Sequence, residues 1–304
     1  MTSDLLGAAA AGTWTLGDLT VNRIGFGAMR LPQYGQAFAP GAVPRDREQA
    51  IAVLRRAVEL GVDHIDTAAF YFSRLRSANE LINRALAPYP AGLVIATKVG
   101  PSRDPSGEWL PLATPEQLRG QVEENLRQLG RDHLDLVNLR VAGLGSITEH
   151  FGVLAGLRDA GLIRHLGISN ARPEHLAQAQ TVAPVVCVQN AYGFAYRRGQ
   201  DAFVDTCGEQ GVAFVPFFAI AGAGREAGTG GDEHEEVLAI ARDHGASPVR
   251  VRLAWALRRG PHVLVIPGTG SPDHLEDNVA AGALRLTADE LSRLDAVHRA
   301  APER

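Results

Sequence analysis

The sequence of 304 residues is poor in lysine, cysteine and methionine, and it has no long apolar run. Its two cysteines, Cys187 and Cys207, are too few for a disulfide framework and lack metal-binding spacing, so we expect buried free thiols. No apolar run approaches the roughly 20 residues of a membrane helix. The net charge of −4 disfavours a polyanion as partner. We therefore expect neither a nucleic-acid nor a membrane partner.

The N-terminal segment lacks the basic residues that a secretory signal requires. Its apolar stretch, residues 5–12, is preceded by Asp4 and by no lysine or arginine. We expect residues 1–12 to be a flexible start and the protein to be cytoplasmic, where thiols stay reduced.

Lysine is nearly absent among the 30 basic residues, because Lys98 is the single lysine. A surface charge can be lysine or arginine, whereas a compact buried ammonium cannot be replaced by a planar guanidinium. Lys98 is therefore either retained by chance or needed for chemistry.

Eight short apolar runs alternate with amphipathic segments along the chain. Continuous runs of this kind are typical of strands buried on both faces. Eight strand–helix units predict a single (β/α)8 TIM barrel over residues 1–304, with a doubly wound sheet as the alternative. Residues 13–21 alternate around Gly17-Asp18 and predict an N-terminal β-hairpin that plugs the barrel floor. The predicted strands cover residues 21–29, 64–68, 93–99, 134–141, 163–168, 185–188, 213–220 and 263–266.

Active sites of such barrels lie at the carboxyl ends of the strands, where several polar residues of this chain fall. A free phenol, with a pKa of about 10, is a weak acid at neutral pH. The Lys98 ammonium near Tyr71 is expected to lower that pKa, and Asp66 can hold the ammonium in place. Together these three side chains would make a general acid of Tyr71.

Five segments in order resemble the aldo-keto reductase family, over about residues 15–298. The longest runs from Gly61 through Asp66 and Tyr71 to Ile82. The others are Ile95-Ala96-Thr97-Lys98, Gly167-Ile168-Ser169-Asn170, Val188-Gln189-Asn190 and Ile266-Pro267-Gly268-Thr269. The resemblance implies a barrel that binds NADP(H) and reduces small-molecule carbonyl compounds without a metal.

By this resemblance Asp66, Tyr71 and Lys98 match three members of the family's catalytic tetrad. The fourth is usually a histidine at the end of the fourth strand, where this chain has Arg140. Arginine can donate hydrogen bonds to a carbonyl oxygen but cannot shuttle a proton. Asn138-Leu139-Arg140 resembles a bacterial pyridoxal-reductase-like subgroup. Arg140 is expected to polarise or orient the substrate and to lower the pKa of Tyr71 further, the alternative being a salt bridge in the barrel mouth.

The resemblance also implies the cofactor site. Ser169, Asn170 and Gln189 match positions that bind the nicotinamide carboxamide, and Phe217 matches the ring that stacks on it. Segment 268–278 lacks the basic residue that many members use for the 2′-phosphate, so NADP(H) is expected and NAD(H) stays open. Arg225 on the glycine-rich segment 221–231 is a possible phosphate ligand. The remaining expected contacts are Gly27, Ala28, Met29, Gly268, Ser271, His274, Asp277 and Asn278.

The expected activity is NADP(H)-dependent reduction of an aldehyde or ketone, with pyridoxal or a natural-product carbonyl as substrate. The expected pocket wall is aromatic and apolar. A cofactor-binding regulatory subunit with little turnover is the alternative. A GxGxxA pattern at residues 222–227 is a weak dinucleotide signal, and His64-Ile65-Asp66 is a weak metal-site signal. The expected wall residues are Met29, Phe70, Phe72, Trp109, Phe194 and Phe218.

Overall fold

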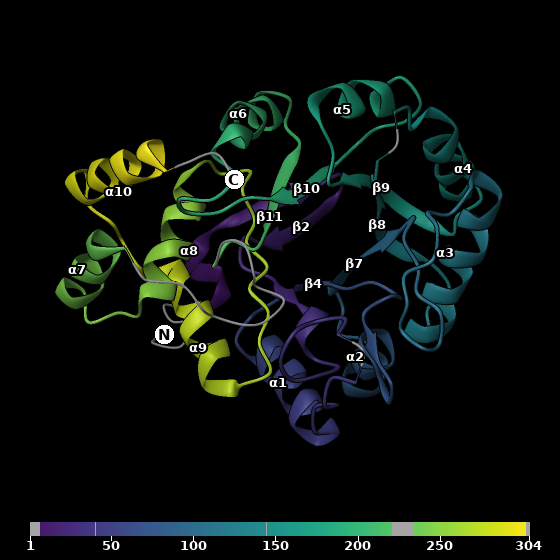
Figure 1. Ribbon diagram of the computed structural model, residues 1–304, viewed down its shortest axis with the longest axis horizontal. Coiled ribbons are helices and arrows are strands. Elements are labelled where there is room, and N and C mark those ends of the chain that lie inside the picture. The colour runs from purple at the N-terminus through teal and green to yellow at the C-terminus, as the bar shows by residue number, and fades with distance from the viewer. Residues whose placement is uncertain (1–6, 40, 144, 221–233, 302–304) are drawn as a thin grey trace.

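The central element of the fold is a curved parallel sheet (Figure 1). The computed structural model describes residues 7–39, 41–143, 145–220 and 234–301. Over these residues the strand order is β11-β10-β9-β8-β7-β4-β3. The strands are β3 (Phe26–Gly27), β4 (His64–Asp66), β7 (Val94–Val99), β8 (Leu134–Arg140), β9 (Ile163–Ser169), β10 (Cys187–Ala191) and β11 (Ala213–Phe217).

Segment 263–265 closes this sheet into a barrel. It forms parallel bridges to both edges, Phe214 with Val263 and Ile24 with Val265. The Leu264 amide donates to the Phe214 carbonyl at 3.0 Å, and the Val265 amide donates to the Arg23 carbonyl at 2.9 Å. The predicted (β/α)8 barrel is confirmed, because a doubly wound sheet would leave both edges open.

Helices follow the strands and lie on the outside of the sheet (Figure 1). At several helix starts a side chain accepts from a free backbone N–H group. Thr114 and Thr287 each form a capping box with the residue three positions on. The helices are α1 (Arg47–Glu59), α2 (Ala78–Leu86), α3 (Pro115–Leu129), α4 (Thr148–Asp159), α5 (Pro173–Gln180), α6 (Asp201–Glu209), α7 (Glu235–Asp243), α8 (Pro248–Arg258), α9 (Pro272–Ala280) and α10 (Ala288–Ala300).

The predicted hairpin forms and fills the barrel floor. Strands β1 (Thr13–Leu16) and β2 (Leu19–Asn22) pair antiparallel around Gly17. Leu16 and Val21 pack into a cluster with inward side chains of the barrel, including Val94 and Leu136. The Asp18 carboxylate at the turn accepts hydrogen bonds from Arg164 and His165, both at 2.6 Å. The hairpin therefore seals the end of the barrel opposite the strand carboxyl ends.

Two N-terminal predictions are wrong. The sequence predicted one strand over 21–29, but two separate strands cover this segment, β2 up to Asn22 and the two-residue β3. The break comes where the Asn22 amide donates to the Asp63 carboxylate at 2.9 Å instead of to a neighbouring strand. Strand β3 is followed by a 3-10 turn, η2 (Ala28–Arg30). The expected flexible start is also incorrect for residues 8–11, which form the 3-10 helix η1 (Ala8–Ala11). Ala8 is fully buried, and its amide donates to the Leu60 carbonyl at 2.8 Å.

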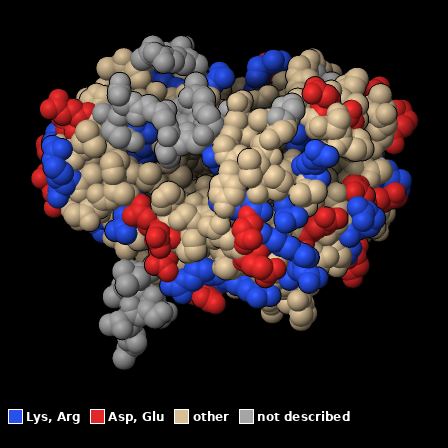
Figure 2. All heavy atoms as spheres, turned by 60° about the horizontal axis from the view of Figure 1, so that its bottom comes forward, with Lys and Arg blue, Asp and Glu red and all other residues tan. Residues whose placement is uncertain are grey.

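The surface mixes charges of both signs. On the face in Figure 2, Lys and Arg side chains alternate with Asp and Glu, in line with the small net charge. Within the described ranges, no helix combines the length and apolar character that crossing a bilayer requires.

The two cysteines, Cys187 and Cys207, are free and buried, as predicted.

Candidate active site

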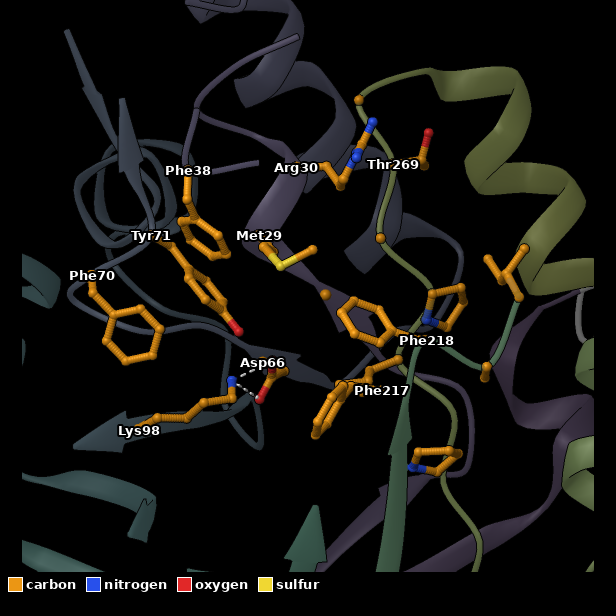
Figure 3. A pocket seen from close by; sticks show the side chains of 18 of the residues that line it. Met29, Arg30, Phe38, Asp66, Phe70, Tyr71, Lys98, Phe217, Phe218 and Thr269 are labelled. Atoms are coloured by element: carbon orange, nitrogen blue, oxygen red, sulfur yellow. Dashed lines mark hydrogen bonds and ion pairs between the residues drawn. The ribbon is translucent and has the colours of Figure 1, made fainter. Parts of the chain in front are cut away.

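A buried ion pair lies at the carboxyl ends of β4 and β7 (Figure 3). The Lys98 Nζ donates to both Asp66 oxygens, at 2.7 and 2.8 Å, and to the Thr67 carbonyl at 3.0 Å. Lys98 is 2% exposed and Asp66 is 4% exposed. The ammonium therefore has a fixed position and three acceptors.

Strand register explains why these two side chains meet. Asp66 pairs with Ala96 across the parallel strands β4 and β7, and Lys98 follows Ala96 by two residues. Side chains two residues apart point to the same face of a strand. Ala96 belongs to the apolar cluster inside the barrel, so Lys98 points into the barrel one layer above it.

Tyr71 lies in the loop between β4 and the short hairpin of β5 (Phe72–Ser73) and β6 (Arg76–Ser77). Its amide donates to the Ala68 carbonyl, and its carbonyl accepts from the Ala78 amide, both at 2.9 Å. The Lys98 Nζ is 4.8 Å from the centroid of the Tyr71 ring. Figure 3 shows the phenol hydroxyl directed toward the Lys98–Asp66 pair.

The predicted direction of the Tyr71 pKa is wrong. Burial raises the pKa of Tyr71 and outweighs the lowering effects of Lys98 and Arg140. The phenol is therefore fully protonated at neutral pH and holds a proton to donate. Burial alone would lower the pKa of Lys98, but the Asp66 carboxylate and Tyr71 reverse this, and the net pKa is raised.

Gln189 contacts the same carboxylate, a role the sequence did not indicate. Its Nε2 donates to Asp66 Oδ2 at 2.9 Å. Its Oε1 is buried and has no hydrogen-bond partner among the described residues. An unpaired buried carbonyl oxygen is costly, so this atom is suited to accept from a bound amide.

Arg140 lies at the end of β8 and reaches the same cavity. Its Nη1 donates to Ser169 Oγ at 3.3 Å, and its guanidinium is 5.1 Å from the Phe217 ring centroid. Over the described part of the chain, Arg140 has no acidic partner within ion-pair distance. The alternative of a salt bridge in the barrel mouth is therefore not realised among the residues that the structure describes.

A cavity of about 640 Å3 connects these groups to the loops above the barrel. Phe38, Phe70 and Trp109 form one wall, with ring centroids 5.3 to 6.5 Å apart. Six of the expected cofactor contacts line it, namely Gly27, Met29, Phe217, Gly268, Ser271 and His274. Of the expected wall residues, Met29, Phe70, Trp109 and Phe218 line it.

The remaining expected contacts are not among the residues that line this cavity, namely Ala28, Ser169, Asn170, Gln189, Asp277 and Asn278. Ala28 is fully buried, and Asn170 Nδ2 donates to the Val141 carbonyl at 2.9 Å. The Asp277 carboxylate binds Ser247 and, at 2.7 Å, Arg250, which ties α9 to α8. Asn278 is buried on α9.

Two expected wall residues face other partners. Phe194 packs on Trp255 at 5.5 Å, and Phe72 lies 4.5 Å from the Arg103 guanidinium. Their apolar character is therefore used in packing, which the sequence could not distinguish from lining a pocket.

The weak sequence signals are not supported by the described residues. Arg225 and the 222–227 pattern lie outside them. No group of three His, Cys, Asp or Glu side chains that could hold a metal occurs over the residues that the structure describes. His64 is buried, and neither of its ring nitrogens has a hydrogen-bond partner there.

Known proteins resemble this chain in sequence and in fold. The model of the Aldo/keto reductase family matches residues 23–299. Pyridoxine 4-dehydrogenase of Escherichia coli (strain K12) is 44% identical over 298 residues, covering 95% of this chain and 99% of that protein. An uncharacterized oxidoreductase of Schizosaccharomyces pombe is 37% identical over 295 residues, covering 96% and 92%. The solved structure of an aldo-keto reductase from Klebsiella pneumoniae in complex with NADPH is 27% identical, with a TM-score of 0.76, covering 94% of this chain and 93% of that one.

Proposed function

Because this chain belongs to the aldo/keto reductase family, we propose that it reduces an aldehyde or ketone to an alcohol with NADP(H), using Tyr71 as the proton donor. The observation that carries the proposal is the buried Lys98–Asp66 pair beside the protonated Tyr71 at the wall of the cavity. Enzymes of this family are oxidoreductases, and the E. coli relative is named as a dehydrogenase.

The residues present fit a nicotinamide cofactor. Gln189 contacts the lining residue Asp66, and its unpaired Oε1 is the proposed acceptor for the carboxamide of the cofactor. Phe217 lines the cavity and is the ring proposed to stack on the nicotinamide. Ser169, at the end of β9 and bound to Arg140, is the further side chain proposed to contact this amide. When bound, the reduced nicotinamide supplies a hydride to the carbonyl carbon.

Tyr71 supplies the proton. As the carbonyl oxygen gains negative charge, the O–H bond of Tyr71 breaks, and its proton passes to that oxygen to give the alcohol. The Lys98 ammonium stabilises the phenolate that remains, since opposite charges attract strongly in a buried site. Asp66 holds Lys98 in place, Gln189 in turn holds Asp66, and neither exchanges protons with the substrate.

Arg140 takes the place of a neutral hydrogen-bond donor near the reacting oxygen. Its planar guanidinium offers several N–H groups, of which one is bound to Ser169. We infer that it polarises the carbonyl or orients a substrate hydroxyl. It cannot act as an acid, because arginine keeps its proton.

The proposed substrate is an aromatic aldehyde such as pyridoxal. The wall of Phe38, Phe70 and Trp109 can stack against a planar ring, because aromatic pairs favour offset and edge contacts. The printed name of the E. coli relative, pyridoxine 4-dehydrogenase, supports the same choice.

Oxidation of NADPH followed at 340 nm, with pyridoxal and benzaldehyde as substrates, tests the proposal. Tyr71→Phe should lower kcat by about 100-fold or more and leave the Kd for NADPH unchanged. Tyr89→Phe is the matched control, because the Tyr89 hydroxyl donates to the Leu129 carbonyl at 2.6 Å outside the cavity. Near-normal activity of Tyr71→Phe would refute the acid role, and equal rates with both aldehydes would refute pyridoxal as the preferred substrate. Tight NADPH binding without any turnover would point to the regulatory alternative.

A further inference from the structure

The end of the cavity opposite Tyr71 contains two arginines that the sequence did not single out. Arg30 ends η2, and Arg45 immediately precedes the α1 N-cap Asp46. Both side chains line the cavity together with Gly270 and Ser271. Figure 3 shows Arg30 beside Thr269, on the far side of the cavity from Lys98.

Arg45 is held in a fixed position. Its Nε donates to the Arg30 carbonyl at 3.3 Å, and its Nη1 donates to the Gly270 carbonyl at 3.4 Å. Its guanidinium carbon lies 4.1 Å from the Tyr34 ring centroid. A Cβ at Gly270 would lie 2.1 Å from that carbon, so a larger residue there would displace the arginine. These two bonds engage two of its five N–H groups.

The positive charge of Arg45 has no counter-ion on the described cavity wall. Asp66 is the only carboxylate among the described lining residues, and Lys98 and Gln189 already occupy it. Nearby acids face elsewhere, since the Asp46 carboxylate accepts from the Gln49 amide and Asp273 is exposed on the first turn of α9. Partial burial lowers the pKa of Arg45, but an arginine stays charged at any physiological pH.

We propose that Arg45, with Arg30 beside it, binds the 2′-phosphate of NADP(H) and sets the preference for it over NAD(H). This proposal rests on the proposed function. Segment 267–280 contains no lysine or arginine, so a cation for a phosphate at this end must come from another part of the chain. Arginine suits the task because its fork can bind two phosphate oxygens at once. The start of α9, where Ser271 is the N-cap, adds favourable backbone N–H groups.

The test measures binding rather than turnover. The dissociation constants of NADPH, NADH and adenosine 2′,5′-bisphosphate are determined by fluorescence titration and calorimetry. Arg45→Ala should weaken NADPH and the bisphosphate by about 10- to 100-fold and leave NADH unchanged, because NADH has no 2′-phosphate for Arg45 to contact. Arg45→Lys should retain part of the affinity, since it keeps the charge but loses the fork.

Arg47→Ala is the matched control, because Arg47 is exposed on the first turn of α1, two residues away. It should change none of the three constants, and circular dichroism checks that each variant is folded. Equal weakening of NADPH and NADH in Arg45→Ala would assign Arg45 to the diphosphate and overturn the proposal. Equal affinity of the unmodified protein for NADPH and NADH would also overturn it while leaving the proposed function intact. Failure to bind either dinucleotide would instead refute the proposed function.

Discussion

Lys98 and Asp66 form an ion pair shielded from solvent, and replacing one partner leaves the other charged and buried. In Lys98→Met the Asp66 carboxylate loses the ammonium and keeps only the Gln189 donor at 2.9 Å. In Asp66→Asn the ammonium keeps two oxygen acceptors but loses the opposite charge. Each single substitution therefore exposes the cost of an uncompensated buried charge.

Removal of one partner from a buried pair of this kind costs about 3 to 5 kcal/mol. A chain of 304 residues has an unfolding entropy of about 0.6 kcal/mol/K. Each single variant should therefore lower the melting temperature by about 5 to 8 °C. In the double variant Lys98→Met/Asp66→Asn neither charge remains, so its loss should be smaller than the sum of the single losses by about 2 kcal/mol or more.

Arg127 and Glu124 provide the matched control. Their closest nitrogen–oxygen distance is also 2.7 Å, but their side chains are 65% and 42% exposed. Arg127→Met should cost about 1 kcal/mol or less, because water screens exposed pairs. Thermal melts and urea titrations of the variants measure these differences. Additive losses in the double variant, or single losses as small as that of Arg127→Met, would refute the reasoning that burial makes the pair cooperative.

Two further predictions concern the hairpin and the pH profile. Gly17→Ala should destabilise by about 2 to 4 kcal/mol in a urea titration, because Gly17 has φ +68° and a Cβ would lie 2.2 Å from the His165 ring. Gly120→Ala, with open space around it in α3, should instead stabilise by about 1 kcal/mol, and similar effects of both would contradict this account. Because burial raises the pKa of Tyr71, the phenol keeps its proton below its ordinary pKa of about 10. The kcat of carbonyl reduction should therefore stay constant from about pH 7 to 9, and a fall centred below about pH 9 would refute Tyr71 as the raised-pKa acid.

The catalytic end of the site was predictable because its residues sit at strand ends. Apolar runs fix where strands end, and in a parallel barrel all those ends meet at one face. The strand pattern alone therefore places Asp66 and Lys98 at the same face. The length of the first strand was not predictable, because the Asn22 amide donates to Asp63, which lies 41 residues away in the sequence.

Electrostatic and packing details depended on neighbours that local sequence does not reveal. The sequence pairs Tyr71 with a cation and so predicts a lowered pKa, whereas the surrounding rings of Phe38 and Phe70 bury the phenol and raise it. Phe70 is adjacent to Tyr71 in the sequence, but Phe38 comes from the segment before α1, so the residues around Tyr71 do not by themselves give the sign of the shift.

The sequence by itself determined the barrel, the hairpin at its floor and the placing of Asp66, Tyr71 and Lys98 at one face, because these follow from periodicity, strand ends and the family's motifs. The tertiary structure alone decided what surrounds that face. It brought Gln189 onto Asp66, left Arg140 without an acidic partner in the described chain, and placed Arg45 against Gly270, 225 residues away. The physical reason is that hydrogen bonds, burial and charge act through space, while sequence patterns record only the neighbours along the chain.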